Sequence, residues 1–152
     1  MTAHRVVLHP RITWPVHKVN DPGKSVPVLA GARAAQAACT GCGVLSRRVH
    51  SRCQRRLGDT AAGGQEVLIH LQVRRFFCRN ASYARTTFAE QIPGLTTRYG
   101  RRTCDLDRAL QAIALALGGR AGARLIGRLA ALASRSTMPR MIRALPDPSP
   151  GT

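Results

Sequence analysis

Acidic residues, lysines, aromatic side chains and long apolar runs are all scarce in this chain. Its 152 residues include 7 Asp and Glu against 24 Lys and Arg, and only Lys18 and Lys24 are lysines. Aromatic residues make up 4% of the chain, so one large core is not expected. Two small units fit better, and small units are commonly stabilised by a metal ion. The longest apolar run, Ala112 to Leu117, is far too short to span a bilayer.

The sequence also lacks the marks of a secreted protein. Its first 25 residues contain Pro10, Pro15 and Pro22 and have no apolar segment of the kind found in signal peptides. The cysteine count is five, and an odd number argues against a closed disulfide framework. We therefore expect a cytoplasmic protein in a reducing compartment, without a membrane partner.

Arginine is what the sequence has in excess. The formal net charge is +17, and the arginines are spread along the chain. The arginine side chain matches phosphates and guanine edges through two parallel hydrogen bonds, so nucleic acid is the leading partner class. A GC-rich genome would explain arginine in place of lysine, but not the shortage of acids. An anionic membrane surface is an alternative that no apolar segment supports.

The segment Cys39-Thr-Gly-Cys42-Gly43 has the form of the first turn of a zinc ribbon. Zinc takes four ligands, usually thiolates or imidazoles, from two short turns. Gly43 permits the tight turn, and Cys78 offers a third thiol after a long gap. The pattern predicts zinc as cofactor, held by Cys39, Cys42 and Cys78. A redox-active cysteine pair is the rival interpretation, but its usual βαβ setting is not visible.

Two strands would return Cys78 to the side of Cys42. The two cysteines are symmetric about residue 60, inside the turn-rich segment 58–64, which predicts strands over about 46–57 and 66–77. One face of the second strand carries Val67, Ile69, Leu71, Val73 and Phe77. The first strand alternates Val49, Ser51, Cys53 and Leu57 with Arg48, His50, Arg52, Gln54 and Arg56. The basic face favours phosphate binding over a merely solvated surface.

The remaining cysteines are not expected to bind metal. Cys53 lies eleven residues beyond Cys42, which on a straight strand is about 36 Å. We expect Cys53 to be a free, half-buried thiol, and His50 fails as a ligand for the same reason of distance. Cys104, at a predicted helix start, is expected to be structural.

The periodicity becomes helical from Cys104. Leu106, Leu110, Ile113 and Leu117 form one stripe, which Gly118-Gly119 ends. A second helix fits 121–131, with Leu125, Leu129 and Leu132 inward, and a third fits 137–145, capped by Ser134 or Ser136. The predicted fold is α+β: a small zinc-ribbon-like β-hairpin followed by a three-helix helix-turn-helix module. The predicted units are a loose arm over 1–25, the ribbon domain over 26–92, the helical domain over 93–146 and a tail over 147–152.

The stretch from about Val28 to Pro146 resembles the N-terminal region of ISL-three family insertion-sequence transposases, in which a zinc finger precedes a helix-turn-helix. The matching motifs, in the family's order, are Cys39-Thr-Gly-Cys-Gly43, Ser46-Arg-Arg-Val-His-Ser-Arg52, Val73-Arg-Arg-Phe-Phe-Cys-Arg-Asn80, Phe88-Ala-Glu-Gln-Ile-Pro-Gly-Leu95, Tyr99-Gly-Arg-Arg-Thr103, Ala112-Ile-Ala-Leu-Ala-Leu-Gly-Gly119, Gly122-Ala-Arg-Leu125 and Ser134-Arg-Ser-Thr137. No single motif is decisive, but the ordered set is specific.

The resemblance implies a function and a missing part. The family's finger and helix-turn-helix recognise the terminal inverted repeats of the element, and a later domain with three acidic residues cuts and joins DNA. This chain ends before that domain would begin, so the resemblance implies a DNA-binding fragment that is not itself an enzyme. The partner is then double-stranded DNA at those repeats, and a homodimer stays open.

Two departures from the family pattern bear on the sites. Tyr83 stands where the family has its fourth zinc cysteine, and a tyrosine hydroxyl is protonated near neutral pH and so a poor ligand. Pro139 stands where the last helix usually has an apolar residue, so that helix either starts near Met138 and is short or is kinked.

The DNA contacts are assigned to arginines of both units. They are Arg48, Arg52, Arg56 and Arg74 on the ribbon, Arg101 and Arg102 at the linker, and Arg135, Arg140 and Arg143 around the last helix. Two alternatives remain at this point: a non-specific nucleic-acid binder or a non-functional remnant of a degraded element, and part of an active transposase split across reading frames.

Overall fold

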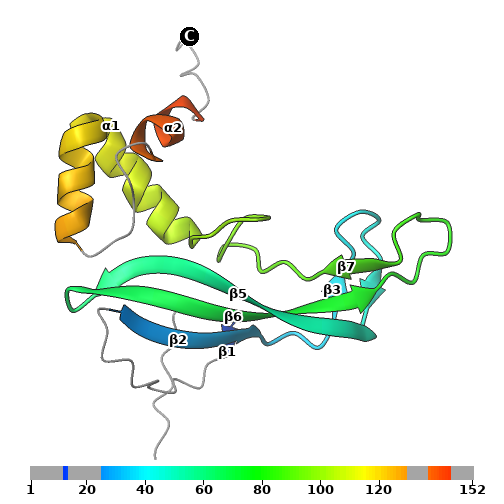
Figure 1. Ribbon diagram of the computed structural model, residues 1–152. Coiled ribbons are helices and arrows are strands. Elements are labelled where there is room, and N and C mark those ends of the chain that lie inside the picture. The colour runs from blue at the N-terminus through cyan, green and yellow to red at the C-terminus, as the bar shows by residue number, and fades with distance from the viewer. Residues whose placement is uncertain (1–11, 14–24, 130–136, 145–152) are drawn as a thin grey trace, which may run out of the picture.

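The computed structural model describes residues 12–13, 25–129 and 137–144, which form a strand-rich sheet followed by two helices (Figure 1). The strands are β1 (Ile12–Thr13), β2 (Ser25–Ala32), β3 (Ala37–Ala38), β4 (Leu45–Ser46), β5 (Val49–Ala62), β6 (Gln65–Phe77) and β7 (Thr87–Ala89). The helices are α1 (Cys104–Arg128) and α2 (Thr137–Arg143). Of the predicted features, Leu132, Ser134, Arg135, Ser136, Leu145, the tail and most of the arm lie outside the described residues.

The main sheet is built around β6. Its strand order is β1-β2-β6-β5, and β7 also pairs with β6. The hairpin of β5 and β6 is antiparallel and turns at Gly63 and Gly64, whose φ angles of 58° and 74° suit a two-residue turn that glycine adopts at little cost. On its other side β6 pairs with β2 in parallel, from Ser25 opposite Glu66 to Gly31 opposite Gln72. The predicted isolated ribbon is therefore part of a five-stranded sheet.

One face of this sheet forms the first hydrophobic core. The predicted alternation places Val67, Ile69, Leu71 and Val73 in it, and all four are buried. Val28 and Ala30 of β2, Leu57 of β5, and Ile92 and Leu95 from the segment after β7 complete the cluster.

The alternation changes phase at the end of the hairpin. Phe76 is fully buried and Phe77 only half-buried, so the prediction that Phe77 lies on the apolar face is wrong. The pairing of β5 with β6 shifts register between Val49 and Ser51, and such irregularities add twist to a strand. Beyond this point β6 leaves the first core, and Phe76 packs in a second cluster with Cys39 and Phe88.

The predicted three-helix helix-turn-helix module is wrong, because the described residues contain two helices. The first helix was expected to end at Gly118, but α1 continues to Arg128. Gly118 has non-helical angles (φ 68°, ψ −168°), and the helix axis bends sharply there (Figure 1). Glycine adopts such angles freely, which explains a bend at this residue. The third predicted helix is present as α2, seven residues long.

The helical core also differs from the predicted stripe. Leu106, Leu110, Ala114 and Ile126 are its buried members, with Met141 and Ile142 of α2 packed against them. Leu125 and Leu129, expected to face inward, are exposed at 37% and 49%, and Leu117 is exposed as well. The bend at Gly118 changes which side of the later turns meets α2, and a straight helical stripe does not anticipate that.

Thr103 joins the helices to the sheet. Its side chain caps α1 by accepting a hydrogen bond from the amide of Leu106, and it donates to Asp59 Oδ1 of β5 at 2.6 Å. Its backbone N–H donates to the carbonyl of Gly58, whose own N–H donates to Arg101. These bonds fix the start of α1 against the hairpin. Neither helix of the described residues is long and apolar enough to cross a membrane.

Candidate metal centre and nucleic-acid interface

The first cysteine turn is a tight knuckle between two very short strands. Ala37 and Ala38 pair with Ser46 and Leu45, which closes the chain on itself. Within the loop, the Cys39 N–H donates to the carbonyl of Val44 and the Gly43 N–H to that of Cys39, both at 2.9 Å. Gly43 has φ 75°, a value that glycine adopts without the Cβ penalty of other residues. The turn expected from the sequence is therefore built as a zinc knuckle requires.

The second loop brings position 83 back to this knuckle. Cys78 follows the end of β6, and its N–H donates to the carbonyl of Thr86. A turn between Asn80 and Tyr83 reverses the chain. The Tyr83 ring then packs among the cysteine cluster, and a Cβ placed on Gly41 would overlap its phenol. Residue 83 therefore lies against the first knuckle. This is where a ligand from the second zinc turn would lie, although the residue here is a tyrosine.

The three predicted ligands converge. The Sγ atoms of Cys39, Cys42 and Cys78 all lie within 4.8 Å of one another, and those of Cys42 and Cys78 are 3.5 Å apart. Tetrahedral zinc with Zn–S bonds of about 2.3 Å needs sulfur atoms roughly 3.8 Å apart. The donor set and its spacing therefore fit zinc, and they are the only group of three His, Cys, Asp or Glu side chains so arranged in the described part of the chain.

The environment acts differently on two of the thiols. Burial raises the pKa of Cys39, but hydrogen bonds from the backbone of Cys42 and Gly41 and from the neighbouring thiols outweigh it, so the pKa is lowered. A backbone hydrogen bond at Asn80 lowers the pKa of Cys78, but burial and its interactions with Cys42 and Cys39 outweigh it, so the pKa is raised. The knuckle amides therefore favour a thiolate at Cys39, the form in which cysteine binds metal.

The other candidate thiols and the histidine lie elsewhere. Cys53 is on β5 opposite Val73 and is exposed, so the expectation of a half-buried thiol is wrong. It lines a cleft beside Val73 and lies outside the cysteine cluster. His50 contacts Phe77 edge to face, with ring centroids 4.9 Å apart. Cys104 is the first residue of α1 and is partly buried.

Comparison with known proteins agrees with this geometry. Residues 35–80, which contain all three converging cysteines, match the family described as the zinc-finger of transposase IS204/IS1001/IS1096/IS1165. The transposase for insertion sequence element IS1001 of Bordetella parapertussis is 31% identical over 102 residues. This chain carries the zinc finger of the ISL-three transposase family. The resemblance predicted from the sequence motifs is confirmed.

The match to that relative is partial. It covers 67% of this chain and 22% of the IS1001 transposase, so the chain spans only a minor part of its relative's length. The matched zinc finger is a non-catalytic region of transposases. No solved structure matches the chain.

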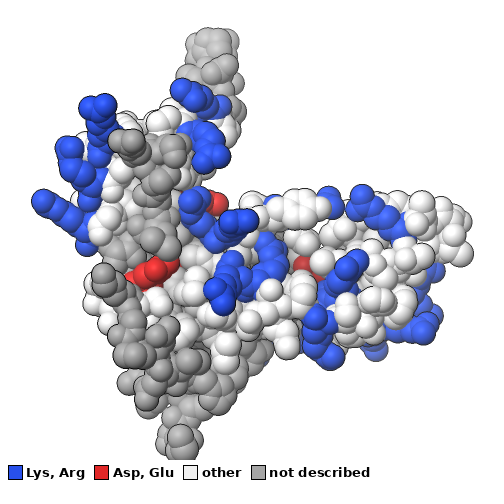
Figure 2. All heavy atoms as spheres, in the orientation of Figure 1, with Lys and Arg blue, Asp and Glu red and all other residues white. Residues whose placement is uncertain are grey.

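Arginine dominates the surface around and beyond the transposase finger. Figure 2 shows basic side chains from the helices, through the middle of the visible face, to the finger, with acidic side chains in few places. Next to Cys78 a hollow of about 620 Å³ is lined by Arg48, predicted as a DNA contact, and by Arg47 and Arg79, which were not predicted. The Arg48 guanidinium lies over Phe77, 4.6 Å from the ring centroid.

The predicted arginines of the hairpin have different surroundings. Arg52 and Arg56 are exposed on β5, as expected of a basic strand face. Arg74, directly opposite Arg52 in the ladder, is instead paired with Glu90 at 2.6 Å, and the Glu90 side chain is only 3% exposed. Arg74 and Glu90 are sixteen residues apart in the sequence, so the residue pattern of the strand does not indicate this ion pair.

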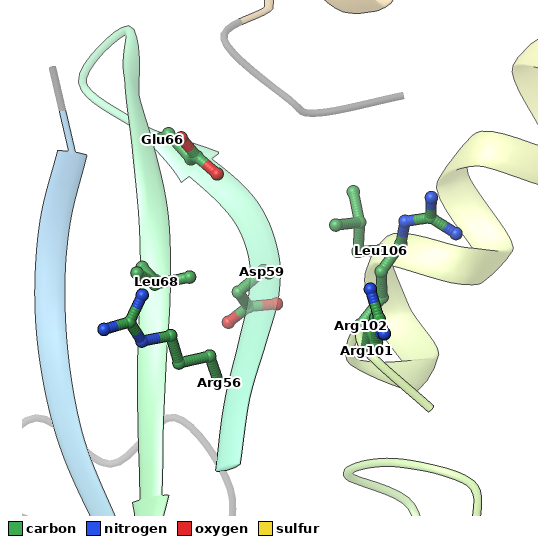
Figure 3. A pocket seen from close by; sticks show the side chains of 8 residues that line it. Arg56, Asp59, Glu66, Leu68, Arg101, Arg102 and Leu106 are labelled. Atoms are coloured by element: carbon green, nitrogen blue, oxygen red, sulfur yellow. The ribbon is translucent and has the colours of Figure 1, made fainter. Parts of the chain in front are cut away.

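Arg56, Arg101 and Arg102 meet at one pocket between the hairpin and the start of α1 (Figure 3). The pocket has a volume of about 280 Å³, and Asp59 and Glu66 also line it. Arg102 is paired with Asp107 at 3.5 Å, whereas Arg101 is exposed. The acids in this pocket offset part of its positive charge, which makes it a weaker anion site than the arginines alone indicate.

The last helix carries its predicted arginines on the surface. Arg140 and Arg143 are exposed on α2, and Pro139 is the third residue of that helix. Proline is tolerated in a first helical turn, so of the two alternatives for this helix the short one is correct. Arg135 lies outside the described residues.

Proposed function

We propose that this chain is a DNA-binding segment of an insertion-sequence transposase that recognises the terminal inverted repeats of its element. The observation that carries the proposal is the convergence of Cys39, Cys42 and Cys78 inside a segment that matches the transposase zinc finger. The net charge of +17 supports a polyanion as the partner.

Zinc held by Cys39, Cys42 and Cys78 would be structural. The bound ion would cross-link the knuckle to the end of β6, two points of the chain that are 36 residues apart at Cys42 and Cys78. Beside the thiols, the Phe76 and Phe88 rings stack with centroids 5.8 Å apart, and Tyr83 packs against the same cluster. The finger therefore combines three candidate metal ligands with a small aromatic core.

The exposed arginines supply the DNA contacts in this proposal. They are Arg48, Arg52 and Arg56 on the hairpin, Arg101 at the linker, and Arg140 and Arg143 on α2. Most would bind phosphate, because contacts to phosphate and sugar outnumber contacts to bases in protein–DNA interfaces. Arg74 and Arg102 have carboxylate partners within the protein, so their role is to hold the fold.

The proposal gives this segment no catalytic role. Strand cutting and joining would require an acidic, metal-binding domain outside the matched residues, on the same polypeptide or from a neighbouring reading frame. A frame encoding such a domain directly downstream would make the chain part of an active transposase, and inspection of that nucleotide sequence tests this alternative.

Metal analysis and DNA binding of the purified chain test the proposal together. We expect one zinc per chain, lost in Cys78→Ser and retained in Cys53→Ser, since Cys53 lies outside the cluster. Fluorescence anisotropy should show preference for a duplex from the element's ends over a scrambled duplex. If all six arginines contact phosphate, the slope of log K against log salt is expected to be about −5, and fewer phosphate contacts would make it shallower.

The outcomes separate the parts of the proposal. Equal affinity for both duplexes would leave a non-specific nucleic-acid binder and refute recognition of the repeats. No binding to either duplex at low ionic strength would refute DNA as the partner. Zinc stoichiometry unaffected by Cys78→Ser would refute the assigned ligands.

A further inference from the structure

A second basic site borders the cysteine knuckle, whose Thr40 lines it, in a cleft of about 400 Å³. Its arginines come from four segments: Arg55 from β5, Arg75 from β6, Arg85 from the loop before β7, and Arg98 from the loop after β7. No carboxylate lines the cleft, and none of these four arginines forms an ion pair within the described residues. The sequence motifs did not indicate the site, because it joins residues from separate segments. Four uncompensated guanidinium groups around one hollow make it an anion site.

The protein fixes two of these arginines in place. Arg55 Nη2 donates to the carbonyl of Gly100 at 2.5 Å, and Arg75 Nη2 donates to Thr87 Oγ1 at 3.0 Å. Each guanidinium has five N–H donors, so one such bond orients the group and leaves most of its donors for a ligand. The cleft is therefore preorganised for an oxyanion before any ligand enters.

Tyr99 stands at the rim of the cleft in an unusual conformation. Its φ of 62° is the only positive value for a residue other than glycine in the described segments, and a bulky side chain rarely adopts it. The side chain is 79% exposed, and the Arg98 guanidinium lies 4.8 Å from its ring centroid. Gly100 follows it with no room for a Cβ, because Thr96 and Thr97 crowd that side. The turn thus holds an aromatic ring out of the core, next to an anion site.

We propose that this cleft binds an unpaired nucleotide of a DNA strand, with its phosphate on the arginines and its base stacked on Tyr99. The inference rests on the proposed function, which is DNA binding. It adds unpaired nucleotides to the duplex DNA that the proposed function already includes. Paired arginine and aromatic contacts are the common means of holding single-stranded nucleic acid. Within a duplex each base face is covered by its neighbours, so only an unpaired or extruded base offers its face to the ring. The volume is within the range of small-ligand sites, which suits one nucleotide.

Three DNA probes test the proposal with the zinc-loaded full chain: a blunt duplex, the same duplex with a short unpaired tail, and the tail strand alone. One stacked base contributes enough to raise affinity about 10-fold, so the tailed duplex should bind about that much more tightly than the blunt one. Tyr99→Gly removes the ring and relieves the positive φ, so it should fold normally and lose this preference. Tyr99→Phe keeps the ring and should keep the preference.

Matched arginine variants separate the cleft from the duplex surface. Arg85→Ala should weaken binding of the tailed duplex and leave the blunt duplex within about twofold. Arg52→Ala, on exposed β5, should weaken both equally, since it removes one phosphate contact common to both. A 5-iodouracil in the tail should photo-crosslink to Tyr99, located by mass spectrometry of the peptide.

The results distinguish this inference from the proposed function. A tail preference unchanged in Tyr99→Gly, or no preference in the unaltered chain, would overturn the inference while duplex binding stands. Binding to none of the three probes would overturn DNA binding itself. If Tyr99→Gly fails to fold, the crosslink decides, and a crosslink at another residue refutes the stacking role.

Discussion

Arg52 and Arg74 face each other across the β5–β6 ladder, yet the structure predicts opposite consequences for their removal. The Arg74 guanidinium donates to both carboxylate oxygens of Glu90, at 2.6 to 3.1 Å, and to the carbonyl of Ala34 at 2.6 Å. Glu90 also accepts from the backbone N–H of Arg74 at 2.7 Å. Arg52 is exposed and forms no ion pair in the described residues. Arg74→Ala should therefore lower stability, and Arg52→Ala should weaken DNA binding.

The magnitudes follow from burial. Removing one partner of a buried ion pair costs about 3–5 kcal/mol, because the other charge stays buried without compensation. Since the Arg74 side chain keeps 17% exposure and Glu90 only 3%, we expect the lower end, about 3 kcal/mol, for Arg74→Ala. Arg52→Ala should change the free energy of unfolding by less than about 0.5 kcal/mol. It should reduce the steepness of the salt dependence of DNA binding by about 0.9.

Urea unfolding followed by circular dichroism measures the stability change, and anisotropy over a salt series measures the slope. DNA binding of Arg74→Ala is compared where that variant is fully folded. The double variant Arg74→Ala/Glu90→Ala removes the orphaned carboxylate and should recover part of the stability lost in Arg74→Ala. If Arg74→Ala instead reduced the slope like Arg52→Ala and kept normal stability, the assignment of Arg74 to the fold would be refuted.

Three further predictions concern the finger and its junction with the helices. Tyr83→Cys supplies a fourth thiolate at the knuckle and should raise zinc affinity at least about 10-fold in chelator competition; unchanged affinity would contradict the placement of residue 83. Gly41→Ala creates the overlap with Tyr83 and should cost about 1–3 kcal/mol in urea unfolding, a loss that Tyr83→Ala in the same chain should largely remove. Thr103→Ala loses the helix cap and the bond to Asp59 and should cost about 2 kcal/mol, whereas Thr103→Ser should lose little; equal effects would show that the hydroxyl is unimportant.

The sequence predicted the meeting of Cys42 and Cys78 and a turn within 58–64, and the turn at Gly63 and Gly64 lies at the end of that segment. Symmetry about residue 60 was expected, whereas the ladder pairs Arg52 with Arg74 and Asp59 with Val67, which centres the hairpin on residue 63. The three-residue difference between the expected and the observed centre is accommodated before β5. There β3 and β4 pair with each other and fold the first cysteine turn back on itself. The two consecutive glycines at 63 and 64, part of the predicted turn segment, are the local signal for the turn.

Long-range contacts account for most of what the sequence could not reveal. Alternation along β6 identified the buried Val67, Ile69, Leu71 and Val73, because burial on one face follows from the strand period. Nothing in that period shows that β2 joins the sheet in parallel, that Glu90 returns to neutralise Arg74, or that Arg55 and Arg98 meet at one cleft.

The two departures from the family pattern are accommodated by the fold, which bears on whether the chain is a decayed remnant. Pro139 falls in the first turn of α2, where its missing N–H has no helical partner to lose. Tyr83 packs its ring against the cluster of Phe76, Phe88 and the thiols, at the place of the missing fourth ligand. A drifting sequence would be expected to leave buried charges unpaired, whereas the buried Glu90 is paired with Arg74. A cooperative unfolding transition of the zinc-loaded chain is the corresponding expectation, and a chain that melts without one would favour the remnant.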